Sequence, residues 1–393
     1  MSAAGKLQEL LRGPLGRIVL PAAILQSLLI GGGYATGREI VAYGAKYGSL
    51  GWLAVVAIFV GFTVMSVLTF EVARLVRAYE YRGFVRQLIG PAWPLFDVLY
   101  GAMAVLVIAI MASAASEIMH DTLAVPPLAS TALVVAAVGG LTYLGASAIE
   151  AFKSVGTVLL YVAYLAFGVA VLWGRWGAVA EVFAAGSTAY VEDAAPLDAL
   201  GSGVLYVGYN LAVYPAVLFV LHRQRERRDS LVSGLLAGVM MTIPFALTYL
   251  CVLAFYPAPR VLDAPVPWLP MLAAAGGGAL VAVYGVVMGW TLLETSVGMI
   301  HAILDRADAT LRRAGGGGGN PEPDPPGEES SGLSRLQRGL IGAGVLAGAA
   351  LLSRVGIVAL VARGYTYMAY GFIALFALPL LTVGVRRVLS ARG

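Results

Sequence analysis

Long stretches without a charged residue recur along this chain. Eight of them approach the roughly 20 residues that an α-helix needs to cross a bilayer. They cover residues 47–70, 98–116, 122–149, 154–174, 199–221, 230–259, 264–293 and 364–385. A ninth run, 18–37, contains three consecutive glycines, and a tenth, 339–353, becomes long enough if Arg338 extends to the lipid headgroups. The pattern predicts an all-α polytopic membrane protein with ten transmembrane helices.

The first predicted span is interrupted by the sequence GGGYATGRE, residues 31–39. Each glycine in a helix interior costs about 1 kcal/mol relative to alanine, so three in a row predict an unwound segment. In hydrocarbon, unwound backbone persists only where it is buried in protein or lines a wet cavity. The break therefore predicts a solute site of the kind that secondary transporters form between half-helices.

A second interruption falls at the corresponding place of the second half of the chain. Five spans in each half give the halves opposite orientations, and the sixth span carries Gly208 and Pro215. We expect a 5+5 inverted repeat with discontinuous helices 1 and 6, in which residues 1–175 and 199–393 are the repeats. Residues 176–198 would form an external loop with a short surface helix, and 314–332 a disordered cytoplasmic linker rich in Gly, Pro and Glu.

Polar residues at the two breaks are the candidates for binding a solute. A phenol or amide can orient a polar solute while the aromatic ring covers its apolar part. The predicted binding residues are Gly31, Gly32, Gly33, Tyr34, Thr36, Tyr206, Tyr209 and Asn210. In contrast, Tyr365, Tyr367 and Tyr370 fit the aromatic belt at the membrane interface.

The composition agrees with this architecture. Hydrophobic residues make up 59% of the chain, charged residues 12%, and the mean hydropathy is +0.83. About three quarters of the Lys and Arg residues fall on one side of the predicted membrane, which places both termini in the cytoplasm and the protein in the inner membrane. The net charge of +4 then reflects topology, so no nucleic-acid partner is expected.

Three segments resemble the YkvI-type membrane protein family. They are GGGYATGREI with GAKYGSLGW after it, LYVGYNLAVYP in the sixth span, and VARGYTYMAYGFIALFALPLLTVGV near the end. That family is similar in layout to the amino acid–polyamine–organocation superfamily, whose members share the LeuT fold. The resemblance implies an ion-coupled carrier for a small polar organic solute such as an amino acid or related amine.

The same resemblance implies a sodium site. Thr295 and Ser296 of the eighth span match the hydroxyl pair that joins carbonyls of the broken first span around Na⁺ in sodium-coupled members; here the carbonyls would come from about Leu29 to Gly32. The alternative is that both hydroxyls bond to the carbonyl four residues earlier or join neighbouring helices. Glu294 has three possible roles: a cation ligand, a proton-coupling acid, or a structural partner of Arg38.

Arg38 and Glu39 follow the first break, and we expect them to form an external gate or an ion pair. On the cytoplasmic side, residues 79–88 predict a short interfacial helix with Arg82 and Arg86 on its polar face.

The chain carries no HExxH, Walker or GxSxG sequence, so we expect no enzyme and no cofactor beyond Na⁺ or H⁺ as coupling ion. The alternatives to a sodium symporter are a proton-coupled carrier and a membrane solute sensor like the germinant receptors. The expected partners are a small solute and the lipid bilayer, and the oligomeric state is left open.

Overall fold

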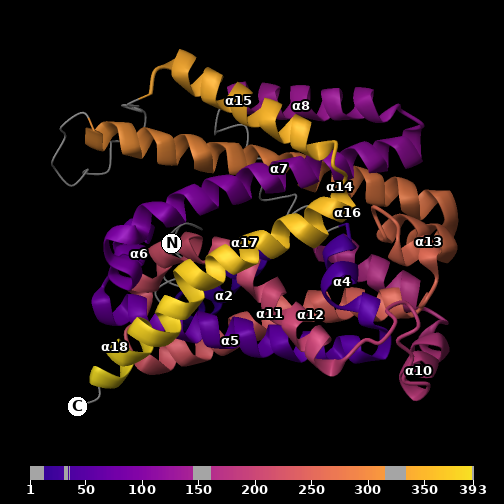
Figure 1. Ribbon diagram of the computed structural model, residues 1–393, viewed down its shortest axis with the longest axis horizontal. Helices are drawn as coiled ribbons and strands as arrows, with labels where there is room; N and C mark the ends of the chain where they lie inside the picture. The colour runs from indigo at the N-terminus through magenta and orange to yellow at the C-terminus, as the bar shows by residue number, and fades with distance from the viewer. Residues whose placement is uncertain (1–12, 31–33, 35, 145–160, 315–332, 392–393) are drawn as a thin grey trace, which may run out of the picture.

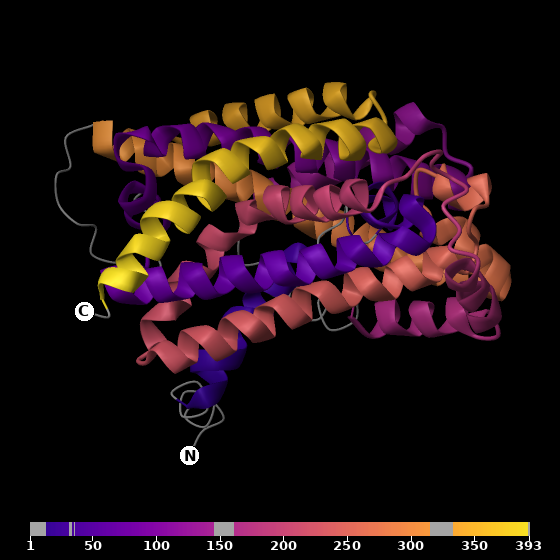
Figure 2. The ribbon, with the colours of Figure 1, turned by 60° about the horizontal axis from the view of Figure 1, so that its bottom comes forward.

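A computed structural model describes residues 13–30, 34, 36–144, 161–314 and 333–391, and all regular structure within those ranges is helical. The long helices run along the long axis of the molecule (Figures 1 and 2). The α-helices, long and short, are α2 Leu20–Leu29, α4 Arg38–Tyr43, α5 Gly51–Val76, α6 Tyr81–Ile89, α7 Trp93–Leu123, α8 Pro127–Leu144, α10 Trp176–Ala184, α11 Pro196–Asn210, α12 Arg227–Leu253, α13 Pro259–Leu262, α14 Trp268–Ala314, α15 Arg335–Ser353, α16 Ile357–Ala359, α17 Tyr365–Phe372 and α18 Val385–Ser390.

Seven helices of the described ranges are long and apolar enough to cross a membrane. An eighth is added if Tyr161–Leu172 and Trp176–Ala184, which are bent by 71°, form one span. The shorter apolar helices are Leu15–Leu29 and Pro127–Leu141. The chain is thus a polytopic helical membrane protein, while the predicted count of ten is not confirmed. The predicted spans 18–37, 122–149 and 154–174 each include residues outside the described ranges, and so does nearly all of the predicted linker 314–332.

The two ends of the bundle carry different short helices. Helices α6 and α18 lie at one end, here called the α6 end, and α10 and α13 lie at the opposite end, the α10 end (Figure 1). Helix α10 is the short helix that the sequence predicted in the loop 176–198. Helix α6 also forms where the sequence predicted a short helix. Arg82 was expected on the polar face of this helix, but that expectation is wrong, because its side chain is buried against the bundle.

Small residues bring the central helices into close contact. Helix α5 packs along both α11 and α12, and α7 packs along α14. A Cβ atom on Gly203 of α11 would lie 2.7 Å from the carbonyl oxygen of Ala54 on α5, and one on Gly234 of α12 would lie 2.6 Å from the backbone nitrogen of Val67. Such separations permit backbone-to-backbone contact, which stabilises helix pairs in membranes through dispersion forces.

Two GxxxG pairs, Gly234–Gly238 in α12 and Gly344–Gly348 in α15, provide a matched test of this packing. Gly234 faces the backbone of α5, whereas a Cβ atom on Gly348 of α15 would have no atom within 4 Å in the described part of the chain. We expect Gly234→Ala to lower the free energy of unfolding by about 1–2 kcal/mol through overpacking. Gly348→Ala should leave it unchanged or raise it by up to about 1 kcal/mol, because alanine favours the helix. Unfolding in detergent measures both, and equal losses would contradict the role of Gly234.

Candidate functional site

The first break lies where the glycine run predicted it. Helix α2 ends at Leu29, and helix α4 begins at Arg38. Gly37, directly before α4, has a φ of +81°, a conformation that glycine adopts without strain. The predicted binding residues Gly31, Gly32 and Gly33 lie outside the described residues.

The second break is a change of helix type. Helix α11 ends at Asn210, and the span continues to Arg223 as a 3₁₀-helix that contains Pro215. Proline lacks the N–H that an α-helix would use at this position. Helix α2 packs against this 3₁₀ segment, so the two interrupted spans are neighbours, as the sequence predicted.

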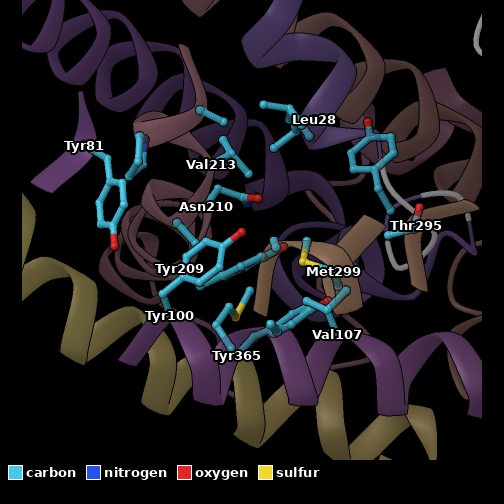
Figure 3. Close-up of a pocket in the computed structure, with 18 of the residues that line it drawn as sticks. Leu28, Tyr81, Tyr100, Val107, Tyr209, Asn210, Val213, Thr295, Met299 and Tyr365 are labelled. Atoms are coloured by element: carbon cyan, nitrogen blue, oxygen red, sulfur yellow. The ribbon is translucent and has the colours of Figure 1, made fainter. Parts of the chain in front are cut away.

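A cavity of about 310 Å³ lies between the interrupted spans and their neighbours. Figure 3 shows side chains from several helices around it, among them Leu28 of α2, Val107 of α7, Asn210 of α11, Met299 of α14 and Tyr365 of α17. Of the residues proposed from the sequence, those in its wall are Leu29, Tyr34, Glu39, Tyr209, Asn210 and Thr295. The structure therefore gathers residues from three distant parts of the sequence around one space.

Two predicted binding residues are buried outside the cavity wall. The Thr36 hydroxyl accepts a hydrogen bond from the Arg38 backbone N–H at 3.2 Å, so it caps the start of α4. Tyr206 is fully buried, with its ring 4.8 Å from that of Phe245 and 5.4 Å from that of Tyr209. Both side chains lie outside the cavity wall and can act on it only by packing against the residues that line it.

Glu39 is the buried carboxylate of the cavity wall. Only 4% of the residue is exposed, and its Oε2 accepts a hydrogen bond from the Tyr209 hydroxyl at 2.5 Å. Tyr365 lines the same cavity and lies beside this carboxylate and Tyr209. The rings of Tyr209 and Tyr365 stack with centroids 4.3 Å apart and planes 14° from parallel. The three side chains form one unit, the Glu39 cluster.

The interfacial role predicted for Tyr365 is therefore wrong. Tyr365 is 2% exposed and begins α17 immediately after a π-helical turn, whereas Tyr367 and Tyr370 are 67% and 57% exposed, as expected at a membrane interface. Phe372 and Phe376 are buried on the same face. Spacings of seven and eleven residues from Tyr365 could have revealed that buried face in the sequence.

Arg38 does not pair with Glu39. Its guanidinium Nη1 donates to the carbonyl oxygens of Leu262, the last residue of α13, at 2.5 Å and of Ala264, on the connection to α14, at 3.2 Å. Within the described part of the chain, no ion pair joins Arg38 to Glu39 or to Glu294, which corrects the pairing hypotheses. The side chains of adjacent helical residues point about 100° apart, so Arg38 and Glu39 contact different parts of the protein.

The α10 end of the site is covered by Trp268, the first residue of α14. Trp268 is fully buried, and a Cβ atom on Gly37 would lie 3.1 Å from its ring. Its backbone N–H donates to the carbonyl oxygen of Thr36 at 3.4 Å, and its ring lies 5.3 Å from that of Tyr164. This packing separates the first break from the α10 end.

The cavity extends toward the α6 end, where sequence reasoning missed a cluster around Asp97 of α7. Its carboxylate accepts hydrogen bonds from the Tyr81 hydroxyl at 2.8 Å and from Arg306 at 2.9 Å, and Arg82 lies 3.6 Å away. The Arg306 guanidinium also lies 3.5 Å from the centre of the Tyr100 ring. Tyr81, Tyr100 and Arg306 line the cavity. We call these five residues the Asp97 cluster.

Only some of the predicted sodium ligands line the cavity. The half-buried Thr295 lines the cavity together with Leu29, while Gly32 lies outside the described residues. The Ser296 hydroxyl is buried and donates to the carbonyl oxygen of Leu292 at 2.8 Å, which is the bond to the preceding turn considered as the alternative. Glu294 is half-buried and lies outside the cavity wall of the described residues.

Comparison with solved structures identifies the architecture. The crystal structure of MhsT in complex with L-phenylalanine aligns over 94% of this chain and 88% of MhsT, with 14% identity and a TM-score of 0.54. The chain shares its helical fold, the LeuT fold. A substrate-bound, outward-open structure of a Na⁺-coupled sialic acid symporter aligns over 94% of this chain and 86% of the symporter, with 10% identity and a TM-score of 0.50. No protein-family model and no curated protein matches the chain, so the YkvI-type resemblance stays a prediction.

Proposed function

We propose that this chain is an ion-coupled secondary transporter that moves a small polar organic solute, an amino acid or related amine, by alternating access. The cavity of about 310 Å³ between two interrupted helices carries the proposal, because half-helices that meet at a buried site are how many secondary transporters bind solutes. Aromatic, amide and carboxylate groups share its wall with apolar residues, which suits a solute with both polar and apolar parts. The fold shared with MhsT, whose structure holds L-phenylalanine, supports the same assignment.

The proposed architecture retains ten spans in two inverted repeats, residues 1–175 and 199–393, with 176–198 as an external loop. The interruption after α2 and the change of helix type after α11 support it, since each falls in the first span of its half. Alternating access would arise as the pair of interrupted spans, with α5 and α12 packed on them, moves against the remaining helices.

We further propose that the protein lies in the inner membrane with its α6 end and both termini in the cytoplasm. Basic side chains at the α6 end support this orientation, among them Arg82, Arg306 and Arg387, the last of which bonds to the Gln87 carbonyl of α6. The cavity would then face the cytoplasm in the state described here.

Counterflow in proteoliposomes tests the proposed transport. Liposomes loaded with unlabelled L-phenylalanine, leucine or other amino acids should accumulate the labelled form of the same compound, whereas protein-free liposomes should not. A solute sensor would bind a compound of the panel without exchanging it. Absence of exchange with every amino acid and amine tested, in a preparation that binds one of them, would reject transport and favour the sensor.

Sodium coupling is a separate proposal, supported by the position of Thr295 in the wall of the cavity that Leu29 also lines. Replacing Na⁺ by choline should reduce uptake, and Thr295→Ala combined with Ser296→Ala should reduce Na⁺-dependent uptake by about tenfold or more, because hydroxyl oxygens suit a hard cation. Ser353→Ala is the control, since that hydroxyl bonds to its own helix near the end of α15. Uptake that is unchanged in the double variant would reject the sodium site.

A proton-coupled carrier is the second candidate, and the Glu39 cluster is the observation that favours it. A buried carboxylate within the cavity can bind and release a proton as the site changes its exposure. Uptake driven by an imposed pH gradient in choline, and unaffected by adding Na⁺, would support this variant over the sodium symporter.

A further inference from the structure

The charges of the cavity wall are unequally compensated. Its ionisable carboxylates and cations among the described residues are Glu39, Asp305 and Arg306. Arg306 forms an ion pair with Asp97 at 2.9 Å, and Asp305, whose side chain is 71% exposed, lies 3.6 Å from Arg338. Glu39 is buried, and in the described ranges no Arg, Lys or His forms an ion pair with it.

The surroundings of Glu39 hold its carboxylate as a hydrogen-bond acceptor. The Tyr209 hydroxyl donates a hydrogen bond to Oε2, and Tyr365, stacked on Tyr209, lies beside the same group. A carboxylate offers about four acceptor positions, so the bond from Tyr209 leaves room for a further donor from the cavity. A buried carboxylate that stays unpaired costs several kcal/mol, so a cationic solute would gain more here than it would in water.

Aromatic rings complete the arrangement around the carboxylate. Tyr209 and Tyr365 stack on each other, and Tyr34 adds a third phenol to the wall; its hydroxyl has no hydrogen-bond partner among the described residues. Ring faces and a carboxylate together are the usual means of binding an ammonium group. Apolar side chains such as Met103 and Val107 of α7 line the cavity farther along and would accept a hydrocarbon body.

We propose that Glu39 is the counter-ion for a protonated amine and that the site selects organic cations with an apolar body over neutral and zwitterionic compounds of the same shape. The inference rests on the proposed transport function and narrows its substrate class. The guanidinium in the described cavity wall, Arg306, is already bound to Asp97, so a carboxylate on the solute would find no unengaged side-chain cation there.

Three compounds of one shape test the charge requirement. They are 2-phenylethylamine, the neutral 2-phenylethanol and the zwitterionic L-phenylalanine. Binding to the purified full-length protein is measured at neutral pH by ligand-induced thermal stabilisation and by calorimetry. We expect the amine to bind about tenfold or more tightly than either of the other two. Equal or tighter binding of 2-phenylethanol or L-phenylalanine overturns the proposal.

Two variants at Glu39 separate charge from folding. Glu39→Gln should weaken binding of the amine by about tenfold or more and remove its advantage over the alcohol. Glu39→Asp keeps the charge and should retain part of that advantage. Glu181→Gln, on α10 outside the cavity, is the matched control and should bind like the wild type. Amine binding by a folded Glu39→Gln protein that equals the wild type overturns the proposal; should that variant not fold, the wild-type and Glu39→Asp comparisons decide.

Counterflow with the same compounds separates failure of this inference from failure of the transport proposal. Exchange of labelled 2-phenylethylamine supports both. Exchange of L-phenylalanine without exchange or binding of the amine leaves transport standing and overturns the cation selectivity. Binding of the amine that depends on Glu39, without exchange of either compound, supports the counter-ion role and rejects transport.

Discussion

Replacing Trp268 by alanine is expected to lower the free energy of unfolding by about 3–5 kcal/mol, the cost typical of removing a large aromatic side chain from a packed core. Trp268 is fully buried, and its ring is in contact range of Gly37 and close to Tyr164 and Phe167. Because this side chain covers the first break from the α10 end, its loss should also let water-soluble reagents reach the cavity from that end.

Thermal or denaturant unfolding in detergent measures the stability change. Trp173→Ala is the matched control, because that tryptophan is 80% exposed and its replacement should change stability by less than about 1 kcal/mol. Accessibility can be followed through a cysteine introduced at Leu29, in a background that lacks Cys251. Similar stability losses for the two tryptophans would show that Trp268 does not support the core as described.

Asp97→Asn is expected to have the second largest effect, a loss of about 2–3 kcal/mol. Asp97 is the carboxylate shared by Arg82 and Arg306 at the α6 end, and an amide cannot balance two guanidinium charges. Removing one partner of a fully buried ion pair costs about 3–5 kcal/mol; the side chains of Asp97 and Arg306 are 22% and 18% exposed, which lowers the expected value.

Asp305→Asn is the control for this substitution. Asp305 lies one residue before Arg306, but its side chain is 71% exposed and its contact with Arg338 is 3.6 Å long, so the loss should stay below about 1 kcal/mol. High salt should reduce the difference between Asp97→Asn and the wild type only slightly, because the Asp97 cluster is largely shielded from solvent. A stability loss no greater than that of Asp305→Asn would contradict the shared-carboxylate role.

Local features of the chain predicted the helices and the first break. Uncharged runs of about 20 residues mark membrane helices because hydrocarbon excludes charges and unpaired backbone groups. The glycine run and the Gly208–Pro215 segment marked interruptions because glycine and proline act on the backbone at their own positions. Tyr209 and Asn210 could be assigned to the cavity since each lies beside its break.

Tertiary placement decided what the sequence could not show. Arg38 and Glu39 are adjacent in the sequence, which suggested an ion pair. In the structure, Arg38 binds backbone carbonyls at the end of α13 and just after it. Glu39 instead lies against the tyrosines of α11 and α17. In the sequence, Tyr365 looks like the exposed tyrosines that follow it. Its burial depends on the packing of α17 against α11, which the local sequence does not show. Asp97 and Arg306 are more than 200 residues apart, so their pairing depends on how α7 packs along α14.

The sign of the charge inside the cavity depends on the rotational phase of a six-residue helix. Helix α4 carries an arginine and a glutamate at consecutive positions, and only its rotation decides which one reaches the solute space. Exchanging the two residues, or inserting one residue between the break and α4, would place the arginine at the cavity-facing position, about 100° around the helix from its present one. An anion-selective descendant could thus arise from this scaffold by a change of register, with every wall residue outside α4 left in place.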